Sequence, residues 1–378
     1  MQSVVIRKIT FLVQWLRSGG AEKQLLLYAC GLARRGYLVH ICTLAFCKTH
    51  PRIEILVREA QRQGVTISRP LSRADGFGFG AGRIIRILLD QSPGVLWMWG
   101  ARAELLCRLF TRQGSRRLLV SAQRSANEQR LRRHKRMLNW RSDRIASYIV
   151  NSESNGRLIA ELIPDAGGKI SIVRNAMADS ELAEAPANLE AAVGRLRVIM
   201  LGNILMQVKG YDVALGAIES CKRRGLPVEL HIGGRPDEGD VLRQIIADHG
   251  LGHMVSYHGE VENPIEFLRT GNTFLTTSRV EGLSNSLLEA MLMGLPCVSS
   301  RVSDVGRFPR ENEHIKSVPI GDAESVVRCW QEMLGNWNEA RAMGRRGRQL
   351  CLETMNSSTI VDQIDGILVD LHKRQPGH

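Results

Sequence analysis

The stretch NTFLTTSRVEGLSNSLLEAMLMGLPCVSS, residues 272–300, decides the fold class. It opens with the strand-like run NTFLTTS, turns through RVEGLS and continues as the helical pattern NSLLEAMLMG, which ends at Gly294. A glycine at that point is typical of a left-handed helix C-cap. The apolar run LPCVSS then returns as a second strand. The stretch therefore predicts a strand–helix–strand unit of a parallel sheet.

Two more units of this kind lie at residues 4–46 and 195–234. Each contains a strand-like apolar run, a helical pattern that ends at a glycine (Gly36 and Gly225), and a second apolar run. Such alternation predicts an α/β fold with doubly wound parallel sheets. A length of 378 residues suits two domains.

We place an N-terminal domain at residues 1–180 and a C-terminal domain at residues 196–356. The segment between them, 181–195, is rich in alanine, contains proline and lacks strand signals, so we expect it to be the linker. The last segment, 357–378, is amphipathic and should pack back onto the N-terminal domain.

Composition excludes several classes of protein. Hydrophobic residues make up 44% and charged residues 24%, which excludes wholesale disorder. No uncharged apolar stretch is long enough for a transmembrane helix. The eight cysteines include no C-x-x-C pair, which suits a reducing cytoplasm and argues against a disulfide scaffold or structural zinc. We therefore expect a cytoplasmic protein.

The charge of the chain is divided unevenly. Residues 1–180 hold 30 Lys and Arg against 12 Asp and Glu, a net charge of +18, whereas residues 181–378 carry −5. A basic half predicts an anionic partner, and nucleic acid, an anionic membrane surface and a phosphorylated substrate all qualify. The alternative is a solvated, arginine-rich surface.

The loops that follow predicted strands hold the candidate site residues, because ligands bind at the carboxyl ends of parallel strands. Gly19 and Gly20 precede a helix, and Lys209 lies at the start of another; each alone also fits an ordinary turn or a solvated surface. Glu281 and Glu289 flank the start of a third helix, for which Ser284 or Asn285 is a suitable N-cap.

Carboxylates bind vicinal sugar hydroxyls, and the N–H groups at the start of this third helix suit an anion. A single glutamate there could merely stabilise the helix dipole, which is a weaker explanation for two. Sugar hydroxyls and phosphates together describe a nucleotide sugar.

Residues 278–300 resemble the E-x7-E signature of retaining GT-B glycosyltransferases of family 4, the glycosyl transferases group 1. Similarity to this family extends over almost the whole chain. SGGAEKQLLLYACGLARRGYLVHICTL resembles its opening glycine-loop unit, LGNILMQVKGYDVALGAI its donor-phosphate segment, and MVSYHGEVEN its loop near the base. The resemblance implies the GT-B fold, in which two Rossmann-like domains face each other across a donor cleft.

The resemblance also implies a role for each matching residue. Glu289 would bind the donor ribose, Glu281 would contact the donor sugar, and Lys209 would neutralise the diphosphate. Glu281 and Lys209 would be the catalytic residues. The full donor-binding set implied is Gly19, Gly20, Asn203, Lys209, Glu281, Gly282, Leu283, Ser284, Asn285 and Glu289.

Two positions depart from the family pattern. Many members have G-R ahead of K-G, but Asn203 follows Gly202 here, so the second cation on the diphosphate is missing or comes from elsewhere, with Arg279 as one option. Many members also have a histidine at the end of the fourth N-domain strand, where this chain has Trp99 nearby.

The implied activity is a retaining hexosyltransferase that uses a UDP- or GDP-sugar and a saccharide or lipid-linked acceptor. It would serve cell-surface polysaccharide or lipopolysaccharide synthesis. No metal or other cofactor is expected, since family members are typically metal-independent and the sequence has no D-x-D triplet. The alternatives are a sugar-nucleotide epimerase or hydrolase on the same fold, and an inactive sugar- or membrane-binding module.

A basic stretch at residues 123–144 suggests the acceptor side. It could lie on anionic lipid at the inner face of the cytoplasmic membrane, or form an ordinary solvated helix. It could equally bind RNA, but no RNA-binding motif accompanies it, so nucleic acid is not an expected partner. The residues assigned to the acceptor and membrane side are Arg124, Arg132, Arg133, Lys135 and Arg136.

Overall fold

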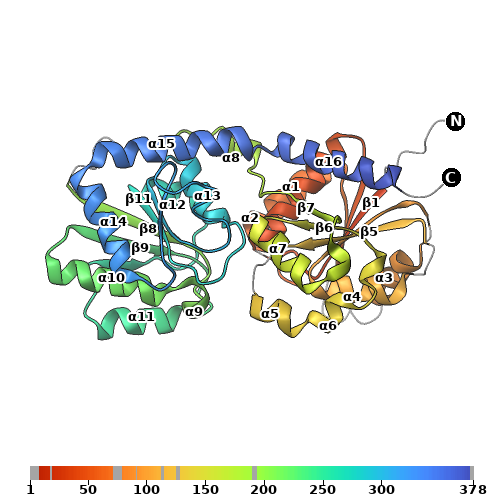
Figure 1. Ribbon diagram of the computed structural model, residues 1–378, viewed down its shortest axis with the longest axis horizontal. Helices are drawn as coiled ribbons and strands as arrows, with labels where there is room; N and C mark the ends of the chain where they lie inside the picture. Colours follow the sequence, from red (N-terminus) through yellow and green to blue (C-terminus); the bar gives the residue numbers. More distant parts are fainter. Residues whose placement is uncertain are drawn as a thin grey trace. The chain divides into compact units, whose positions relative to one another are not determined.

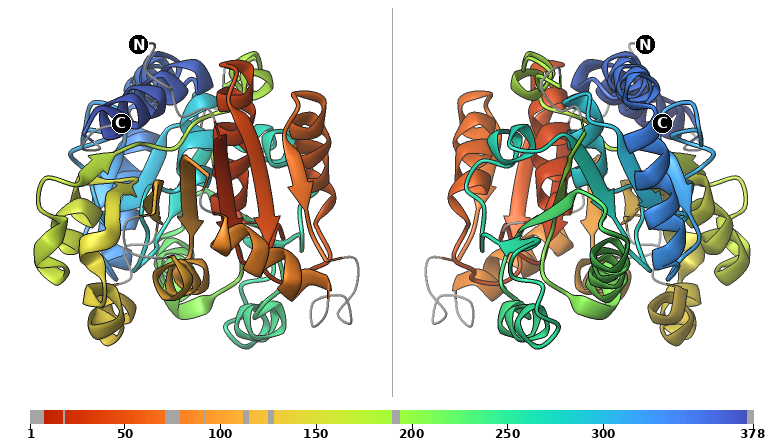
Figure 2. Two further views of the ribbon diagram at one scale, coloured as in Figure 1. Left: turned by 90° about the vertical axis from the view of Figure 1, so that its right-hand side faces the viewer. Right: turned by 90° about the vertical axis from the view of Figure 1, so that its left-hand side faces the viewer.

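The computed structural model describes residues 8–17, 19–70, 79–90, 92–111, 115–124, 128–189 and 194–374. The chain divides into two compact units. Unit 1 comprises residues 1–178 and 357–378, and unit 2 comprises residues 179–356. Each unit contains one parallel sheet with helices packed around it (Figures 1 and 2).

Unit 1 is built on a seven-stranded sheet of order β3-β2-β1-β4-β5-β6-β7, and every paired neighbour is parallel. The order runs outward in both directions from β1 and β4, which makes the gap between these two strands the topological switch point. The strands are β1 (Lys8–Val13), β2 (Leu38–Thr43), β3 (Thr66–Ser68), β4 (Gly94–Trp99), β5 (Arg117–Gln123), β6 (Ile145–Val150) and β7 (Ile170–Ile172).

The helices of unit 1 flank both faces of this sheet (Figure 2, left). Two short 3-10 turns, η1 (Ser142–Arg144) and η2 (Pro164–Ala166), lie on either side of β6 and α7. The helices are α1 (Gly20–Arg34), α2 (Pro51–Arg62), α3 (Phe79–Leu89), α4 (Ala101–Phe110), α5 (Glu128–Arg133), α6 (Lys135–Asn139), α7 (Glu153–Leu162) and α16 (Ser357–Lys373).

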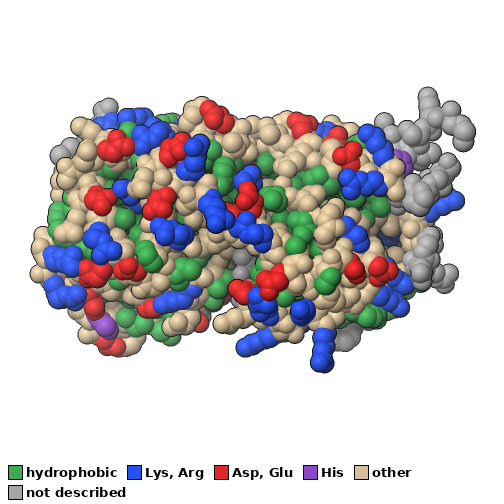
Figure 3. Space-filling model, in the orientation of Figure 1, with side chains coloured by type: hydrophobic (Ala, Val, Ile, Leu, Met, Phe, Trp, Pro, Cys, Tyr) green, Lys and Arg blue, Asp and Glu red, His purple; other side chains and the backbone are tan. Residues whose placement is uncertain are grey.

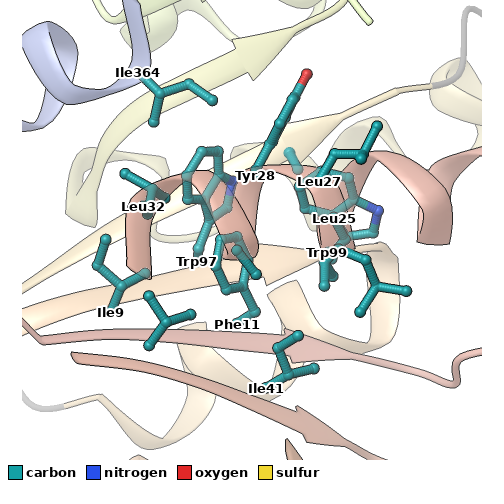
Figure 4. Close-up of a cluster of buried hydrophobic side chains, with 14 of the residues drawn as sticks. Ile9, Phe11, Leu25, Leu27, Tyr28, Leu32, Ile41, Trp97, Trp99 and Ile364 are labelled. Atoms are coloured by element: carbon teal, nitrogen blue, oxygen red, sulfur yellow. The ribbon is translucent and has the colours of Figure 1, made fainter. Parts of the chain in front are cut away.

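Aromatic side chains fill the core between the sheet and α1 (Figure 4). Phe11 of β1 stacks on Trp97 of β4 with ring centroids 5.0 Å apart, and Trp99 lies 6.1 Å from Trp97. Tyr28 of α1 covers both indoles, with its hydroxyl pointing away from the cluster. These rings fix α1 over the switch point of the unit.

Helix α16 belongs to unit 1 although 178 residues of unit 2 precede it in the chain. Val361 lies against Gly31 of α1 so closely that a Cβ at Gly31 would come within 2.4 Å of it. Tyr37 donates a 2.5 Å hydrogen bond to Asp365, and Gln363 donates to the carbonyl of Ile172. The amphipathic C-terminal segment therefore completes the first core.

Unit 2 repeats the topology with six strands of order β10-β9-β8-β11-β12-β13, again all parallel. Its switch point lies between β8 and β11. The strands are β8 (Leu196–Leu201), β9 (Val228–Gly233), β10 (Val255–Tyr257), β11 (Thr273–Thr276), β12 (Cys297–Ser300) and β13 (Lys316–Val318). The helices are α8 (Asp179–Leu182), α9 (Met206–Lys209), α10 (Tyr211–Arg224), α11 (Gly239–Asp248), α12 (Pro264–Arg269), α13 (Asn285–Leu292), α14 (Ala323–Gly335) and α15 (Trp337–Thr354).

The predicted fold class is confirmed: both units are doubly wound, parallel α/β structures. The predicted glycine stops follow their helices with positive φ, at +83° for Gly36, +64° for Gly225 and +75° for Gly294. Part of the expected linker packs on unit 2, where the Ala187 N–H donates to the carbonyl of Met293 at 2.8 Å. Within the described residues, no helix combines the length and apolar character that a bilayer span requires.

Candidate active site

The two loops at the switch point of unit 2 carry the predicted catalytic residues. One loop follows β8 and leads through Gly202 and Asn203 to α9, whose last residue is Lys209. The other follows β11 and contains Glu281 before α13 begins. Because adjacent strands turn to opposite sides of the sheet at a switch point, their loops leave a crevice for a ligand.

Lys209 and Glu281 are in direct contact. The Lys209 ammonium forms an ion pair with Glu281 Oε2, and the two side chains are 24% and 21% exposed. Ser278 Oγ donates to the same carboxylate oxygen at 3.4 Å. The two predicted catalytic side chains thus occupy one partly exposed position, a cation and an anion within reach of a polar ligand.

Thr277 and Gly210 hold Lys209 in place. Thr277 Oγ1 donates to the carbonyls of Gly210 at 2.8 Å and Lys209 at 3.2 Å. Gly210 has a φ of +68°, and a Cβ there would lie 2.1 Å from the Thr277 carbonyl oxygen. Only glycine fits this close approach. Lys209 and Gly210, the K-G pair of the sequence, therefore act together: the glycine allows the close approach that holds the lysine against the loop after β11.

The loop after β9 supports the same helix. A Cβ on Gly234 would lie 1.6 Å from the carbonyl oxygen of Gly202, so the β8 and β9 loops touch through bare backbone. Glu238 accepts a 2.6 Å hydrogen bond from the Met206 N–H at the start of α9. Sequence reasoning missed this support, for which the pair Gly233–Gly234 was the available signal.

Helix α13 begins at the predicted place. Ser284 is its N-cap, and its hydroxyl accepts from the Leu287 N–H at 3.4 Å. The positive end of the helix dipole therefore lies at the loop that contains Glu281, Gly282 and Leu283. Glu289 follows in the second turn and is only 6% exposed. A buried carboxylate and a helix N-terminus are thus placed on one element.

The guanidinium of Arg279 is bound to a carboxylate of the protein, that of Asp212. Its guanidinium binds both carboxylate oxygens of Asp212 on α10, at 2.8 and 2.5 Å, and donates to the Gln207 carbonyl. The hydrogen bond from Arg279 holds the pKa of the Asp212 carboxyl below its usual value. The residue suggested as a second diphosphate cation thus ties the β11 loop to α9 and α10.

Gly19 and Gly20 lie at the switch point of unit 1. Gly19 is the N-cap of α1 with an extended φ of −84°, and no side chain caps this helix start. Its carbonyl accepts from the Lys23 N–H at 3.2 Å. A Cβ at Gly19 would lie 2.2 Å from Glu22 Oε2, so an acidic side chain of the first turn already lies at the N-terminus of α1.

Arg124 lies at the carboxyl end of β5, at the edge of the unit 1 sheet where ligands of such folds bind. It follows β5, donates to the Tyr28 hydroxyl at 3.0 Å and binds Asn175 Oδ1. Its guanidinium also lies over the rings of Tyr28 and Trp99, 5.5 and 5.6 Å from their centroids. Trp99, which lies near the place where a family histidine was expected, therefore builds a stacked cation–aromatic cluster at this edge.

The other basic residues assigned to the acceptor side lie on α5 and α6. Arg132 forms two 2.7 Å ion pairs, with Glu128 and Glu161. Arg133, Lys135 and Arg136 are exposed to solvent. Figure 3 shows basic side chains that project from the lower edge of this unit, below α5 and α6.

Comparison with known proteins agrees with this geometry. The family described as glycosyl transferases group 1 matches residues 195–336. The chain is 26% identical over 208 residues to LpsE, a lipopolysaccharide core biosynthesis glycosyltransferase of Rhizobium meliloti, and the match covers 54% of this chain and 59% of LpsE. It is 32% identical over 140 residues to AmsK, an amylovoran biosynthesis glycosyltransferase of Erwinia amylovora, covering 35% of this chain and 34% of AmsK.

The fold resembles that of solved structures over nearly the whole chain. The crystal structure of HepE from Anabaena in complex with UDP superposes with a TM-score of 0.76 at 16% identity, covering 96% of this chain and 100% of HepE. The sequence match lies on the unit that carries Lys209, Glu281 and Glu289. The chain thus has the GT-B fold, and its residues 195–336 match the family described as glycosyl transferases group 1.

Proposed function

We propose that this chain is a retaining glycosyltransferase that moves a hexose from a UDP- or GDP-sugar to a saccharide or lipid-linked acceptor. The observation that carries the proposal is the contact between Lys209 and Glu281 at the switch point of unit 2, beside the N-terminus of α13. A cation, a carboxylate and a helix N-terminus together suit a diphosphate attached to a sugar.

In the proposed mechanism, Lys209 and the α13 N-terminus stabilise the departing diphosphate. The bond from the anomeric carbon to the phosphate oxygen breaks, and the sugar ring becomes positively charged, as in glycosidases. The negative charge develops on the diphosphate, where a fixed charge-assisted donor contributes about 3 kcal/mol to transition-state stabilisation. No divalent ion is required, because Lys209 and the helix dipole supply the positive charge.

Retention follows if the acceptor attacks from the face that the diphosphate leaves. The acceptor oxygen forms the new bond to the anomeric carbon, and its proton passes to an oxygen of the leaving phosphate. Glu281 positions the donor sugar through its hydroxyls, and Glu289 binds the ribose.

The relatives support a role in cell-surface glycan synthesis. LpsE and AmsK are named for lipopolysaccharide core and amylovoran biosynthesis, respectively. HepE has been crystallised with UDP and with UDP-glucose. An acceptor of this class is a saccharide, free or attached to lipid. The proposed location is cytoplasmic, peripheral on the anionic inner face of the membrane, where the basic residues of unit 1 meet lipid.

A donor screen tests the proposal. The protein is incubated with UDP- and GDP-sugars, and binding is followed by thermal shift, because a bound donor raises stability by mass action. Transfer of the preferred sugar to saccharide acceptors is then followed by NMR of the new anomeric centre. A product with the anomeric configuration of the donor supports the proposal, and an inverted product contradicts it. Turnover that needs no acceptor would instead support an epimerase or hydrolase.

A further inference from the structure

Helix α4 of unit 1 combines exposed apolar side chains with buried charged ones. Its outward side chains include Leu105, Leu109 and Phe110, which are 37%, 48% and 44% exposed. Its inward side chains include Glu104 and Arg108, which are 2% and 0% exposed. A helix that faces water places charged residues outside and apolar residues inside. The outward face of α4 therefore suits an apolar partner.

A polar network beneath α4 fixes this orientation. Arg108 forms a buried ion pair with Glu104 and donates a 2.5 Å hydrogen bond to the carbonyl of Trp140. Ser121 and Gln123 of β5 donate to Glu104 Oε2 at 3.2 and 2.8 Å. Rotation of the helix to hide its leucines would break this network and leave buried charge unpaired. The exposed apolar face is thus built into the fold.

More exposed apolar side chains flank α4. Helix α3 packs beside it (Figure 1) and exposes Ile85 and Leu89, at 46% and 48%. Trp140 is 37% exposed, and Arg141 stacks on its ring at 4.7 Å while donating to the Leu109 carbonyl at the end of α4. We name the following set the α3–α4 apolar face: Ile85, Leu89, Leu105, Leu109, Phe110 and Trp140.

The chain around this face is strongly basic. Residues 79–117 contain seven arginines and two acidic residues. Both acidic residues are neutralised within the unit, Asp90 by Lys8 at 2.7 Å and Glu104 by Arg108. The arginines with exposed side chains on or next to α3 and α4 are Arg86, Arg102 and Arg116. Among the described residues, three exposed arginines therefore lie on or next to the helices that carry the apolar face.

We infer that the α3–α4 apolar face docks on an anionic lipid bilayer. Its apolar side chains enter the boundary between headgroups and acyl chains, and the surrounding arginines bind lipid phosphates. Arginine suits this place because its stem covers apolar surface while its guanidinium binds phosphate. A second copy of this chain would bring the same arginines into contact, and like charges repel. An anionic bilayer supplies both the apolar layer and the opposite charge.

Apart from Trp140, which directly follows α6, this docking surface lies on other elements than α5 and α6. On α5, Arg132 is already neutralised by Glu128 and Glu161. The α3–α4 apolar face is thus the part of unit 1 that meets the membrane. This inference rests on the proposed function in one respect: a lipid-linked acceptor explains why the protein would contact a bilayer.

Flotation of the full chain with vesicles tests the inference. Vesicles contain phosphatidylcholine alone or phosphatidylcholine with phosphatidylglycerol, at several salt concentrations. The variant Leu105→Gln/Leu109→Gln/Phe110→Gln should bind the anionic vesicles roughly tenfold or more weakly than the wild type, because three apolar side chains no longer leave water. The variant Arg86→Gln/Arg102→Gln/Arg116→Gln should lose the salt-sensitive part of binding.

Matched controls use exposed residues elsewhere. The variant Ile55→Gln/Val241→Gln/Ile320→Gln removes three apolar side chains that are 67%, 52% and 49% exposed and lie outside the face. It should bind like the wild type. The variant Arg132→Ser/Arg133→Ser/Lys135→Ser/Arg136→Ser tests α5 and α6 as an alternative docking surface. Melting temperatures verify that every variant is folded.

The outcomes are separable. Wild-type binding by the leucine–phenylalanine variant, or equal binding of the wild type to neutral and anionic vesicles, overturns the inference. The inference is also overturned if the wild type binds no vesicles and light scattering shows a wild-type dimer that this variant no longer forms. Failure of the proposed function can be told apart from failure of this inference. Lys209→Ala should float with anionic vesicles like the wild type, whether or not the wild type transfers sugar.

Discussion

Lys209 and Glu281 lie 72 residues apart in the sequence, yet their side chains form an ion pair where the β8 and β11 loops of unit 2 meet. In this state the Glu281 carboxylate binds the Lys209 ammonium, which a diphosphate would need as its own partner. Ser278 already donates to the same carboxylate oxygen, so it offers Glu281 a hydrogen bond when Lys209 turns to a ligand. The pair thus keeps the lysine oriented before a donor arrives.

Lys209→Ala should lower turnover about 100- to 1000-fold, the usual loss when one fixed donor to a developing negative charge is removed. The melting temperature should change little, because Lys209 is partly exposed at the end of a short helix. Initial rates and thermal melts are compared with those of Lys222→Ala, an exposed lysine of the same unit. Near-normal turnover in folded Lys209→Ala would remove this residue from the mechanism.

Glu289→Ala should weaken donor binding, because a ribose contact is lost. Glu281→Ala should depress turnover more than binding, because its carboxylate lies next to the reacting sugar. Calorimetry with the nucleotide gives the affinities, and steady-state kinetics give the turnover. If the two variants change both quantities alike, the separate roles assigned to these glutamates are wrong.

Gly210→Ala should destabilise the protein by about 3 kcal/mol, for two reasons. The new Cβ would overlap the Thr277 carbonyl, and the alanine would have to adopt a left-handed backbone conformation. Gly225→Ala is the matched control. Its φ of +64° is nearly the same, but nothing lies within 4 Å of the new Cβ, so we expect a loss of about 1 kcal/mol. Denaturant titration measures both; equal losses would mean that the close approach at Thr277 carries no cost.

EDTA should leave the transferase activity largely intact. The positive charge opposite the diphosphate is proposed to come from Lys209 and the α13 N-terminus, neither of which a chelator removes. Activity is measured before and after dialysis against EDTA, and again after addition of magnesium. Loss of activity that magnesium restores would contradict this view of the leaving-group chemistry.

Asp212→Asn should lower stability by up to about 1 kcal/mol near neutral pH, a modest effect because the ion pair with Arg279 is partly exposed. Arg279 holds the pKa of the Asp212 carboxyl below its usual value. A lowered folded-state pKa stabilises the fold above the unfolded value of about 3.9, and the effect disappears as the pH falls through the folded pKa. Unfolding free energies are compared across this range; a difference that persists in strong acid would rule out the pair as its source.

The sequence predicted the elements that local patterns determine. Gly36, Gly225 and Gly294 marked helix ends because a positive φ after a helix favours glycine. Ser284 was identified as a possible cap because its hydroxyl can replace a missing backbone acceptor. Lys209 and Glu281 were each expected beyond the carboxyl end of a strand, but their contact with each other was not predicted.

Contacts between distant loops were not predictable from local patterns. The pairing of Arg279 with Asp212 depends on the register of α10 against the β11 loop, and so does the close approach of Gly210 to Thr277. The orientation of α4 was also hidden, because Leu105 and Leu109 alone indicate a buried face. Only the position of Glu104 next to β5 reveals that the charges lie inside.

The two-segment construction of unit 1 sets an order of events during synthesis on the ribosome. Ile360, Val361, Ile364 and Leu368 of α16 belong to the buried core that covers the first sheet. That core stays incomplete until the whole of residues 179–356 has been translated. Unit 2 is contiguous in the chain, so it can reach its native state while unit 1, translated earlier, still waits for its last helix. The unit translated second is therefore the one that can finish folding first.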